Sequence, residues 1–236
     1  MIILITGASR GIGASLAAEF TRLDHQVLLV SRNKRKLEEV ASACNKAAGK
    51  ELAFPVPFDL ADLADLENEF VSTIKRYTTR LDGLVNNAGH LINQPFTDVS
   101  LKEARQLFEI NFFMPAQLIR ISVPFMEGST LKHVVNISGM GGFQGSSKFP
   151  GLSYYSASKA ALANLSECLA EELQTLGIRV NALAIGSVQT EMLAEAFPGF
   201  KAPLTPGEMA GFLQWFILHG GNYFNGKVLP VSTSTP

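Results

Sequence analysis

The sequence predicts an α/β fold in which one doubly wound parallel sheet of about seven strands is flanked by helices on both faces. Two features of the chain predict this class. Short apolar runs alternate with stretches of helical periodicity throughout, and most runs are apolar at consecutive positions, as in strands that are covered on both faces. The 236 residues, 47% of them hydrophobic, also suffice for one domain with a sizeable core.

Seven apolar runs account for the strands in chain order. They are Ile2–Ile5, Val27–Val30, Leu52–Val56, Leu84–Val85, Val134–Ile137, Val180–Ile185 and Val228–Val231. The stretches between them carry helical periodicity and capping residues, which suits right-handed helical crossovers between parallel strands. No linker, repeat or low-complexity segment interrupts the pattern, so we expect a single domain over residues 1–236.

Charge and composition exclude several kinds of partner. A net charge of -1, from 20 basic and 21 acidic residues, offers no general attraction for nucleic acid or an anionic membrane, so we expect neither. The four histidines are dispersed without metal-ligand spacing, so we expect no metal site. Cys44 and Cys168 are expected to be free thiols. Met1 leads directly into the first strand and no apolar run is long enough to span a membrane, so we expect a cytoplasmic protein.

A glycine-rich turn follows the first predicted strand and leads directly into a helical pattern. It reads Thr6-Gly7-Ala8-Ser9-Arg10-Gly11-Ile12-Gly13. Glycine allows a tight turn and lets a ligand approach the main chain, where the free N–H groups of a helix start favour phosphate. The turn therefore predicts a dinucleotide site, with a purely structural turn as the alternative. The residues expected at this site are Gly7, Ser9, Arg10, Gly11, Ile12 and Gly13.

Polar residues also follow four of the predicted strands, at the edge of the sheet where ligands bind in such folds. These segments are Ser31-Arg32-Asn33-Lys34-Arg35, then Asp59, then Asn86-Asn87-Ala88-Gly89, and finally Ser138-Gly139.

With these segments in view, the chain resembles the short-chain dehydrogenase/reductase family over essentially its whole length. The resemblance rests on the glycine turn, on Asn86-Asn87-Ala88-Gly89, on Asn111 and on Tyr155-Ser156-Ala157-Ser158-Lys159, in the family's order. It implies a Rossmann-type fold and a dimer or tetramer that interconverts a carbonyl and an alcohol on a small molecule. It also implies an adenine contact by Asp59 beside Leu60, although Asp59 or Asp62 could instead cap the following helix. The further cofactor-binding residues that it implies are Asn86, Ala88, Gly89, Gly186, Val188 and Thr190.

Two arginines decide the expected cofactor. Sites that prefer NAD(H) usually place an acidic side chain about 20 residues beyond the glycine turn, whereas a 2′-phosphate needs arginine. Here that position reads Ser31-Arg32, and Arg10 adds a second guanidinium. We therefore expect NADP(H). The basic residues 32 and 34–36 could also be the solvated start of a helix with acidic partners, which is our preferred interpretation for Lys34 and Lys36.

Tyr155 and Lys159 are the expected reaction centre. They are four residues apart on one face of a helix, so the ammonium can act on the phenol. A tyrosine with a pKa near 10 needs roughly 4 kcal/mol of stabilisation of its phenolate to act near neutral pH. The resemblance implies that Tyr155 is the general acid or base, that Lys159 also holds the nicotinamide ribose hydroxyls, and that Asn111 supports a proton relay. A surface pair on a helix is the alternative.

One departure from the family concerns the serine that normally follows the fifth strand and donates to the substrate oxygen. Counting forward from Ser138 places it at Gly139, whereas counting back from Tyr155 places it at Gly142. Neither residue can donate from a side chain, and an oxyanion donor is typically worth about 2.7–4 kcal/mol. We retain the adjacent Ser138 as a candidate catalytic residue, although on a strand its side chain should face away from its neighbour's. The loop serines Ser146, Ser147 and Ser153 are the other candidates for a substitute.

The substrate side offers less information. Ile185 stands where the family favours proline, while Thr190 keeps the position that contacts the nicotinamide carboxamide. An apolar slot could be lined by Phe143, Phe149, Leu193, Phe197 and Phe200, which could equally pack a lid or contact a partner. The apolar helices around residues 111–114 and Ala160–Leu173 suggest burial between subunits or within one chain.

Two functions follow from the sequence. The first is an NADP(H)-dependent carbonyl reductase or alcohol dehydrogenase. The second is a catalytically weakened NADP(H)-binding scaffold or sensor, because of the missing serine at Gly139.

Overall fold

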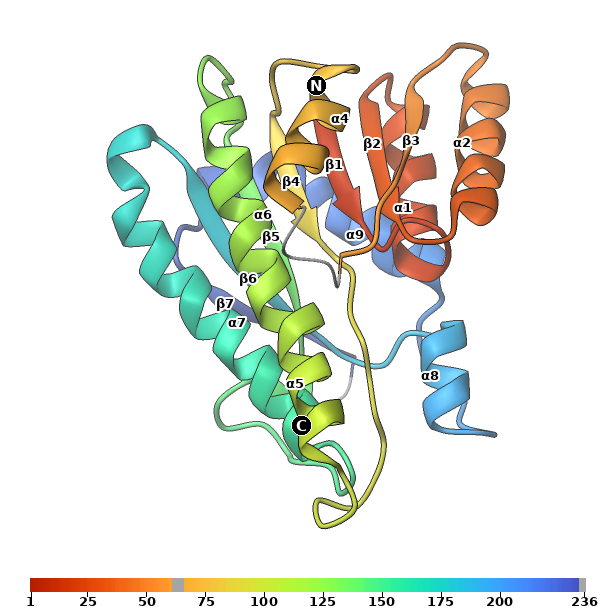
Figure 1. Ribbon diagram of the computed structural model, residues 1–236, viewed down its shortest axis with the longest axis vertical. Coiled ribbons are helices and arrows are strands. Elements are labelled where there is room, and N and C mark those ends of the chain that lie inside the picture. Colours follow the sequence, from red (N-terminus) through yellow and green to blue (C-terminus); the bar gives the residue numbers. More distant parts are fainter. Residues whose placement is uncertain (61–65, 234–236) are drawn as a thin grey trace.

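The computed structural model describes residues 1–60 and 66–233, and its centre is one seven-stranded sheet. All neighbouring strands are parallel, in the order β3-β2-β1-β4-β5-β6-β7 (Figure 1). The strands are β1 Ile2–Thr6, β2 Gln26–Ser31, β3 Ala53–Pro57, β4 Gly83–Asn86, β5 His133–Gly139, β6 Arg179–Ile185 and β7 Val228–Val231. This confirms the predicted fold class. Asp62, one candidate helix cap, lies outside the described residues.

Every predicted strand exists, and six of the seven have ends shifted by one or two residues. The shifts arise because the prediction used apolar residues alone. Polar residues such as Gln26, Ser31 and Asn86 pair in the ladder at the strand ends, where hydrogen bonding rather than hydrophobicity decides membership.

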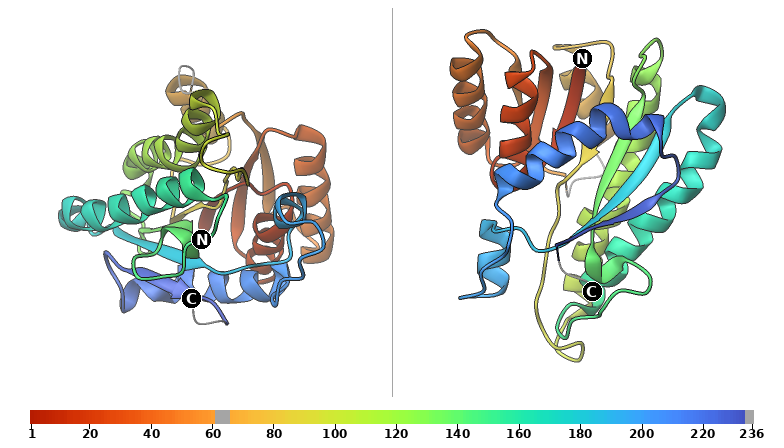
Figure 2. Two further views of the ribbon diagram at one scale, coloured as in Figure 1. Left: turned by 90° about the horizontal axis from the view of Figure 1, so that it is seen from below. Right: turned by 180° about the vertical axis from the view of Figure 1, so that it is seen from behind.

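Helices cover both faces of the sheet (Figure 2). They are α1 Gly11–Arg22, α2 Lys34–Ala48, α4 Val71–Lys75, α5 Leu101–Phe108, α6 Met114–Ser122, α7 Ser153–Glu172, α8 Glu191–Ala196 and α9 Pro206–His219. Within β1, Ile3 and Ile5 pack with α1, α2 and α9, whereas Leu4 packs with α4, α6 and α7. The alternating side chains of a strand thus supply two cores, as a doubly wound sheet requires.

Two π-helical segments lie on the face that α4 to α7 cover. They are η1 Leu66–Phe70 and η2 Glu109–Phe113, and the second joins α5 to α6. A π turn carries one extra residue, and such turns are frequent at functional sites. Asn111 lies in the middle of η2 and is completely buried.

The remaining helical segments are short 3-10 turns. They are η3 Val123–Met126, η4 Met140–Gly142, η5 Gln174–Leu176 and η6 Gly220–Asn222. Cys44 is buried, Cys168 is exposed, and both thiols are free. None of the helices in the described ranges has both the length and the hydropathy to cross a bilayer.

Candidate active site

A cavity of about 650 Å³ opens at the carboxyl ends of the central strands. Its walls come from the turn between β1 and α1 and from the residues that follow β2, β3, β4, β5 and β6. β1 lies between β2 and β4, so the chain leaves the centre of the sheet in both directions here. Such a reversal of strand order is where doubly wound sheets bind ligands.

Three glycines shape the floor of the cavity. Gly7 has a φ of +66°, and a Cβ atom there would lie 2.9 Å from the Cα atom of Ala88. Gly11 has a φ of +55°, and a Cβ atom on Gly13 would collide with the carbonyl oxygen of Gly7. Larger residues would push the turn away from Ala88 and from the start of α1, so the glycines allow the turn to pack closely. Gly13 itself does not line the cavity and serves this packing.

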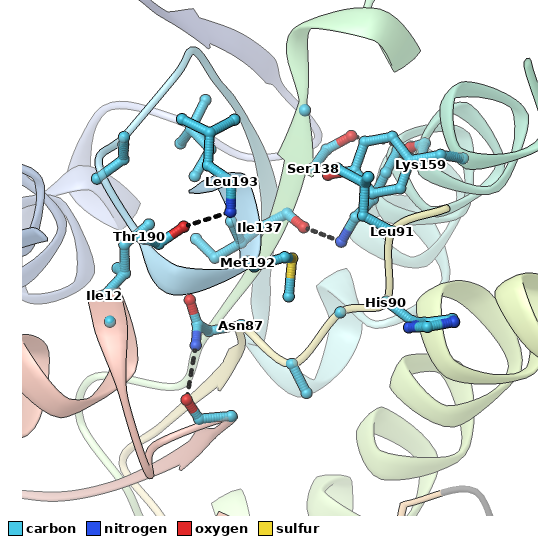
Figure 3. A pocket seen from close by; sticks show the side chains of 18 of the residues that line it. Ile12, Asn87, His90, Leu91, Ile137, Ser138, Lys159, Thr190, Met192 and Leu193 are labelled. Atoms are coloured by element: carbon cyan, nitrogen blue, oxygen red, sulfur yellow. Dashed lines mark hydrogen bonds between the residues drawn. The ribbon is translucent and has the colours of Figure 1, made fainter. Parts of the chain in front are cut away.

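Thr6 and Asn87 hold the glycine turn in place. The Thr6 Oγ1 atom accepts hydrogen bonds from the backbone N–H groups of Asn87 at 3.0 Å and Ala88 at 2.9 Å. The Asn87 Nδ2 atom donates to the carbonyl oxygens of Thr6 at 2.9 Å and Gly7 at 3.3 Å. Figure 3 draws one of these two bonds. Our sequence analysis assigned neither side chain to the site. The sequence signal that could have identified them is a polar residue at the end of each of two neighbouring strands.

Asn86, by contrast, lies outside the cavity although we expected it to bind cofactor. Its Nδ2 atom donates to Asn136 Oδ1 at 2.7 Å, and Asn136 Nδ2 donates to Ser166 Oγ at 2.8 Å. Asn86 is buried and faces α7, because side chains alternate along a strand and its neighbour Asn87 faces the turn. The structure therefore gives Asn86 a packing contact between β4, β5 and α7.

Most of the other expected residues line the cavity. They are Gly7, Ser9, Arg10, Gly11, Ile12, Arg32, Asp59, Leu60, Ala88, Gly89, Ser138, Tyr155, Lys159, Gly186, Val188 and Thr190.

Lys159 is buried in the wall of the cavity. Its Nζ atom donates to the carbonyl oxygen of Ile137 at 2.8 Å (Figure 3), and its own carbonyl oxygen accepts from Ser138 Oγ at 2.9 Å. β5 thus binds both the ammonium group and the backbone carbonyl of Lys159. The hydroxyl of Ser138 is committed to α7, so it does not replace the missing serine in this conformation.

Asn111 lies behind the cavity wall. Its Nδ2 atom donates to the carbonyl oxygen of His90 at 2.9 Å and to Ser158 Oγ at 3.0 Å, and its Oδ1 atom accepts from the His90 N–H at 2.8 Å. A Cβ atom on Gly89 would lie 3.4 Å from Lys159 Nζ and 3.5 Å from Asn111 Oδ1. The glycine therefore leaves a small gap between the lysine and the asparagine.

The charges at Tyr155 and Lys159 differ from our expectation. Burial raises the pKa of Tyr155 to about 12 and lowers the pKa of Lys159 to about 8. Desolvation by the surrounding protein decides both pKa values in the protein alone. The phenol is consequently protonated at neutral pH.

Gly139 and Gly142 are the two candidate positions of the serine that the resemblance led us to expect. A Cβ atom on Gly139 would lie 3.3 Å from the hydroxyl oxygen of Tyr155, whereas one on Gly142 would lie 2.7 Å from the backbone nitrogen of Ala160. Only the first position faces the reaction centre. The second packs the loop tightly against α7.

The loop serines differ in their availability. Ser146 Oγ donates to the carbonyl oxygens of Met140 and Phe143, so it fastens the loop to itself. Ser147 lines the cavity, whereas Ser146 and Ser153 do not.

The two arginines are at the rim of the cavity. Arg10 Nη1 lies 2.9 Å from Glu195 Oε1 of α8, an ion pair whose side chains are 38% and 67% exposed. Arg32 is exposed and lines the cavity, and its charge adds to burial in lowering the pKa of His90. Both guanidinium groups are therefore placed where they can meet a phosphate.

Apolar side chains line the far end of the cavity. Phe149, Leu193, Phe197 and Phe200 are among them, whereas Phe143 is not. Met192 and Leu193 come from α8. Thr190 caps the start of this helix, and its Oγ1 atom accepts from the Leu193 N–H at 3.2 Å (Figure 3). No group of histidine, cysteine and carboxylate side chains that could hold a metal ion occurs within residues 1–60 and 66–233.

Comparison with known proteins identifies the family. The family model described as short chain dehydrogenase matches residues 1–199. The ketoacyl reductase HetN of Nostoc is 31% identical over 208 residues, covering 85% of this chain and 70% of the relative. The dehydrogenase/reductase SDR family member 7B of Danio rerio is 32% identical over 202 residues, which cover 84% of this chain but only 64% of that protein.

Solved structures agree with these relatives. A protein assigned as a short chain dehydrogenase from Shigella flexneri, complexed with NADP, superimposes with a TM-score of 0.88 at 29% identity, covering 97% of this chain and 95% of that one. One from Escherichia coli CFT073, complexed with NADPH, has a TM-score of 0.87 at 28% identity with the same coverage. The chain therefore belongs to the short-chain dehydrogenase/reductase family of oxidoreductases.

Proposed function

We propose that this protein is an NADP(H)-dependent oxidoreductase that interconverts a carbonyl and an alcohol. The observation that carries the proposal is the convergence of Tyr155 and Lys159 on the same cavity as the glycine turn. When bound, NADP(H) supplies or accepts a hydride at its nicotinamide ring. The Shigella and Escherichia neighbours, which were crystallised with NADP and NADPH, support this cofactor.

The residues present fit such a cofactor. Gly7 and Gly11, both with positive φ, line the cavity, and the N–H groups at the start of α1 suit a pyrophosphate. Arg10 and Arg32 supply the positive charge that a 2′-phosphate requires. No acidic residue stands at the end of β2, where a site selective for NAD(H) would place one.

Tyr155 donates a proton to the carbonyl oxygen of the substrate in the proposed reduction. With a pKa of about 12 the phenol holds its proton at neutral pH, as a donor must, but it is a weak acid, so the proposed reaction needs Lys159 to stabilise the phenolate. Lys159, held by Ile137, is the proposed partner of the ribose hydroxyls. Asn111 is a positioning residue that fixes the backbone of His90 next to Lys159. We no longer assign a catalytic role to the hydroxyl of Ser138, since it is bonded to α7.

The substrate that fits this cavity is a small carbonyl compound with an apolar body. Leu193, Phe197 and Phe200 supply an apolar wall opposite the polar groups of β5 and α7. An apolar wall with few polar groups selects by shape and hydrophobicity.

Assembly and location are further parts of the proposal. Leu101 and Phe113 expose 66% and 48% of their surface on the α5 to α6 segment, which suits a homodimer or homotetramer.

Free Cys44 and Cys168 suit a reducing cytoplasm. We also propose that residues 1–236 act as one domain. Sedimentation velocity would test the assembly, and a monomer at micromolar concentration would contradict it.

A cofactor-binding scaffold is the second candidate function, and Gly139 is the observation that favours it. With no side-chain hydroxyl at this position, Tyr155 lacks its usual helper, which would slow the chemistry.

One experiment separates the two functions. We expect the protein to bind NADPH and to oxidise it with some members of a ketone and aldehyde panel. Tyr155→Phe should lower the rate of NADPH oxidation by at least about a hundredfold, since general acid catalysis contributes that much. The variant should still bind NADPH. Tyr154→Phe is the matched control, because Tyr154 stacks on Phe96 with ring centroids 5.5 Å apart and does not line the cavity. Binding without oxidation at any pH would favour the scaffold, and no binding of NADPH would contradict both functions.

A further inference from the structure

Asn93 joins three segments of the chain beside the apolar end of the main cavity. Its Nδ2 atom donates to the carbonyl oxygen of Ala196, the last residue of α8, at 2.9 Å. Its Oδ1 atom lies so close to Gly151 that a Cβ atom on the glycine would collide with it. The backbone N–H of the next residue, Gln94, donates to the carbonyl oxygen of Gly151 at 3.0 Å. The loop after β4 therefore contacts both α8 and the loop before α7.

All three segments also contribute apolar side chains to the cavity. Leu91, Phe149 and Phe197 come from the loop after β4, the loop before α7 and the end of α8, and each stands within two residues of a partner in these contacts. Asn93 itself is exposed and does not line the cavity. Its side chain is therefore placed to fix the position of the apolar wall without being part of it.

The two loops are joined a second time. The ring of Phe96, in the loop after β4, stacks on the ring of Tyr154 at the start of α7, with centroids 5.5 Å apart. The backbone bond between Gln94 and Gly151 also needs no side chain of Asn93. Removal of the Asn93 amide should consequently leave the two loops together and release α8 alone.

α8 has few attachments of its own. None of its six residues is buried, and Figure 1 shows it apart from the helices that cover the sheet. Val188 and Leu204 pair in an isolated bridge, which closes the base of the segment that carries α8. A helix this short is not stable alone, so contacts with the rest of the chain decide where its far end lies.

Two contacts from other elements reach the far end of α8. One is the ion pair of Arg10 and Glu195, whose side chains are 38% and 67% exposed. Ion pairs this exposed contribute little to stability. The other is the hydrogen bond from Asn93 to Ala196, which is the contact on the substrate side of the helix, next to Phe197.

We propose that Asn93 is a positioning residue that decides which substrates fit the cavity. By binding the end of α8, it keeps Phe197 close to the two loops, so that the apolar wall encloses a small carbonyl compound and excludes a bulky one. An apolar pocket selects by such shape complementarity. The inference rests on the proposed function, which assigns a carbonyl substrate to this end of the cavity.

Asn93→Ala tests the proposal directly. kcat and KM are measured with NADPH for butanal, acetophenone and benzophenone, in order of increasing bulk. We expect KM for the two smaller substrates to rise about two- to tenfold with unchanged kcat, which is the effect of losing one hydrogen bond that supports ground state and transition state equally. kcat/KM for benzophenone should rise, because the opened wall admits it. Asn222→Ala, at an exposed asparagine of η6 away from the cavity, is the matched control and should behave like wild type.

Gly151→Ala tests the same contact from the opposite partner. Its new Cβ atom would displace Asn93 Oδ1, so the variant should shift the preference toward benzophenone as Asn93→Ala does. Gly145→Ala is the matched control in the same loop. The two glycines have φ angles of +81° and +80°, so both variants carry similar backbone strain, but a Cβ atom on Gly145 would have nothing within 4 Å.

Hydrogen exchange of the α8 amides supplies a measurement that needs no turnover. Asn93→Ala should speed their exchange relative to Asn222→Ala, because the far end of the helix loses a contact. The dissociation constant for NADPH should stay unchanged, since the bridge of Val188 and Leu204 still holds the base of the segment.

The outcomes separate this inference from the proposed function. Wild-type protein that binds no NADPH, or that binds it and reduces no carbonyl compound, contradicts the proposed function. An active wild type whose preference between acetophenone and benzophenone persists in Asn93→Ala and Gly151→Ala overturns the inference alone. Loss of activity by the same factor toward all three substrates overturns it as well, because that result indicates general destabilisation. Unchanged exchange of α8 in Asn93→Ala overturns it even where turnover is slow.

Discussion

Gly139 faces Tyr155 so closely that a Cβ atom on the glycine would lie 3.3 Å from the phenolic oxygen. This distance is shorter than most Cβ contacts, so a side chain at this position would touch the phenol directly. Gly139 therefore supplies no side-chain hydroxyl beside Tyr155.

Restoring the hydroxyl should speed the reaction. We expect Gly139→Ser to raise kcat for carbonyl reduction at least about tenfold, because one oxyanion donor is typically worth a hundred- to a thousandfold. Steady-state kinetics with the best ketone substrate measures the change. Gly142→Ser is the control in the same segment, and it should destabilise the protein because its Cβ would meet the backbone of Ala160 at 2.7 Å. A folded Gly139→Ser protein that binds NADPH but turns over no faster would refute the prediction.

Cofactor preference should depend on Arg32. We expect Arg32→Asp to weaken NADPH at least about tenfold relative to NADH, because it replaces a charge-assisted contact to the 2′-phosphate by a repulsive one. The ratio of the two dissociation constants measures this effect. Arg35→Asp is the matched control, since Arg35 pairs with Glu39 and does not line the cavity. An unchanged ratio in Arg32→Asp would exclude Arg32 as the determinant.

The pH dependence of reduction should report Lys159. Its pKa is lowered to about 8, so the ammonium is present below that pH and is lost as pH rises through it. Tyr155, with a pKa of about 12, stays protonated over the same range. We therefore expect kcat/KM for NADPH to be constant from about pH 6 to 7, to fall to about half near pH 8 and to decrease further above it, since this ratio reports the free enzyme. A flat profile up to pH 10 would show that the charge on Lys159 is not needed.

His133 should make the protein sensitive to acid. Its Nδ1 donates to the carbonyl oxygen of Ile217 at 2.9 Å and its Nε2 accepts from Asn181 Nδ2 at 3.0 Å, so the buried ring is neutral. Burial lowers its pKa to about 4 from an ordinary value of 6.5. Between these values the unfolded chain binds a proton that the folded chain does not, so the free energy of unfolding falls as pH drops, by up to about 3 kcal/mol from this residue.

Urea unfolding at several pH values measures this contribution. We expect His133→Gln to be less stable at pH 7 but to lose less stability than wild type between pH 6.5 and 4. His219→Gln, at an exposed position, should keep the wild-type slope. Equal slopes in wild type and His133→Gln would rule out the effect.

The sequence predicted elements and motifs well because both depend on local composition. Seven apolar runs predicted the seven strands. The glycine turn and the pair of Tyr155 and Lys159, both predicted as site residues, line the same cavity. Side-chain direction was harder to predict. Asn86 and Asn87 are adjacent and identical in type, and only the pleat of β4 turns one toward α7 and the other toward the glycine turn.

Long-range geometry explains the rest of what sequence reasoning missed. Two counting schemes placed the absent serine at Gly139 or Gly142, and only the path of the loop against α7 separates them. The pair between Arg10 and Glu195 joins residues whose proximity depends on where α8 lies. The balance of burial and charge at Tyr155 likewise depends on packing around the phenol, which no spacing rule contains.

The hydrogen bonds between Thr6 and Asn87 join residues 81 positions apart. The glycine turn is thus completed only when β1 and β4 have paired at the centre of the sheet, which is a non-local contact. Before β4 is in place, the amino-terminal segment alone does not form a complete nucleotide site. A nucleotide should therefore leave the refolding rate nearly unchanged, slow unfolding, and lengthen the lifetime of molecules that have already reached the native state.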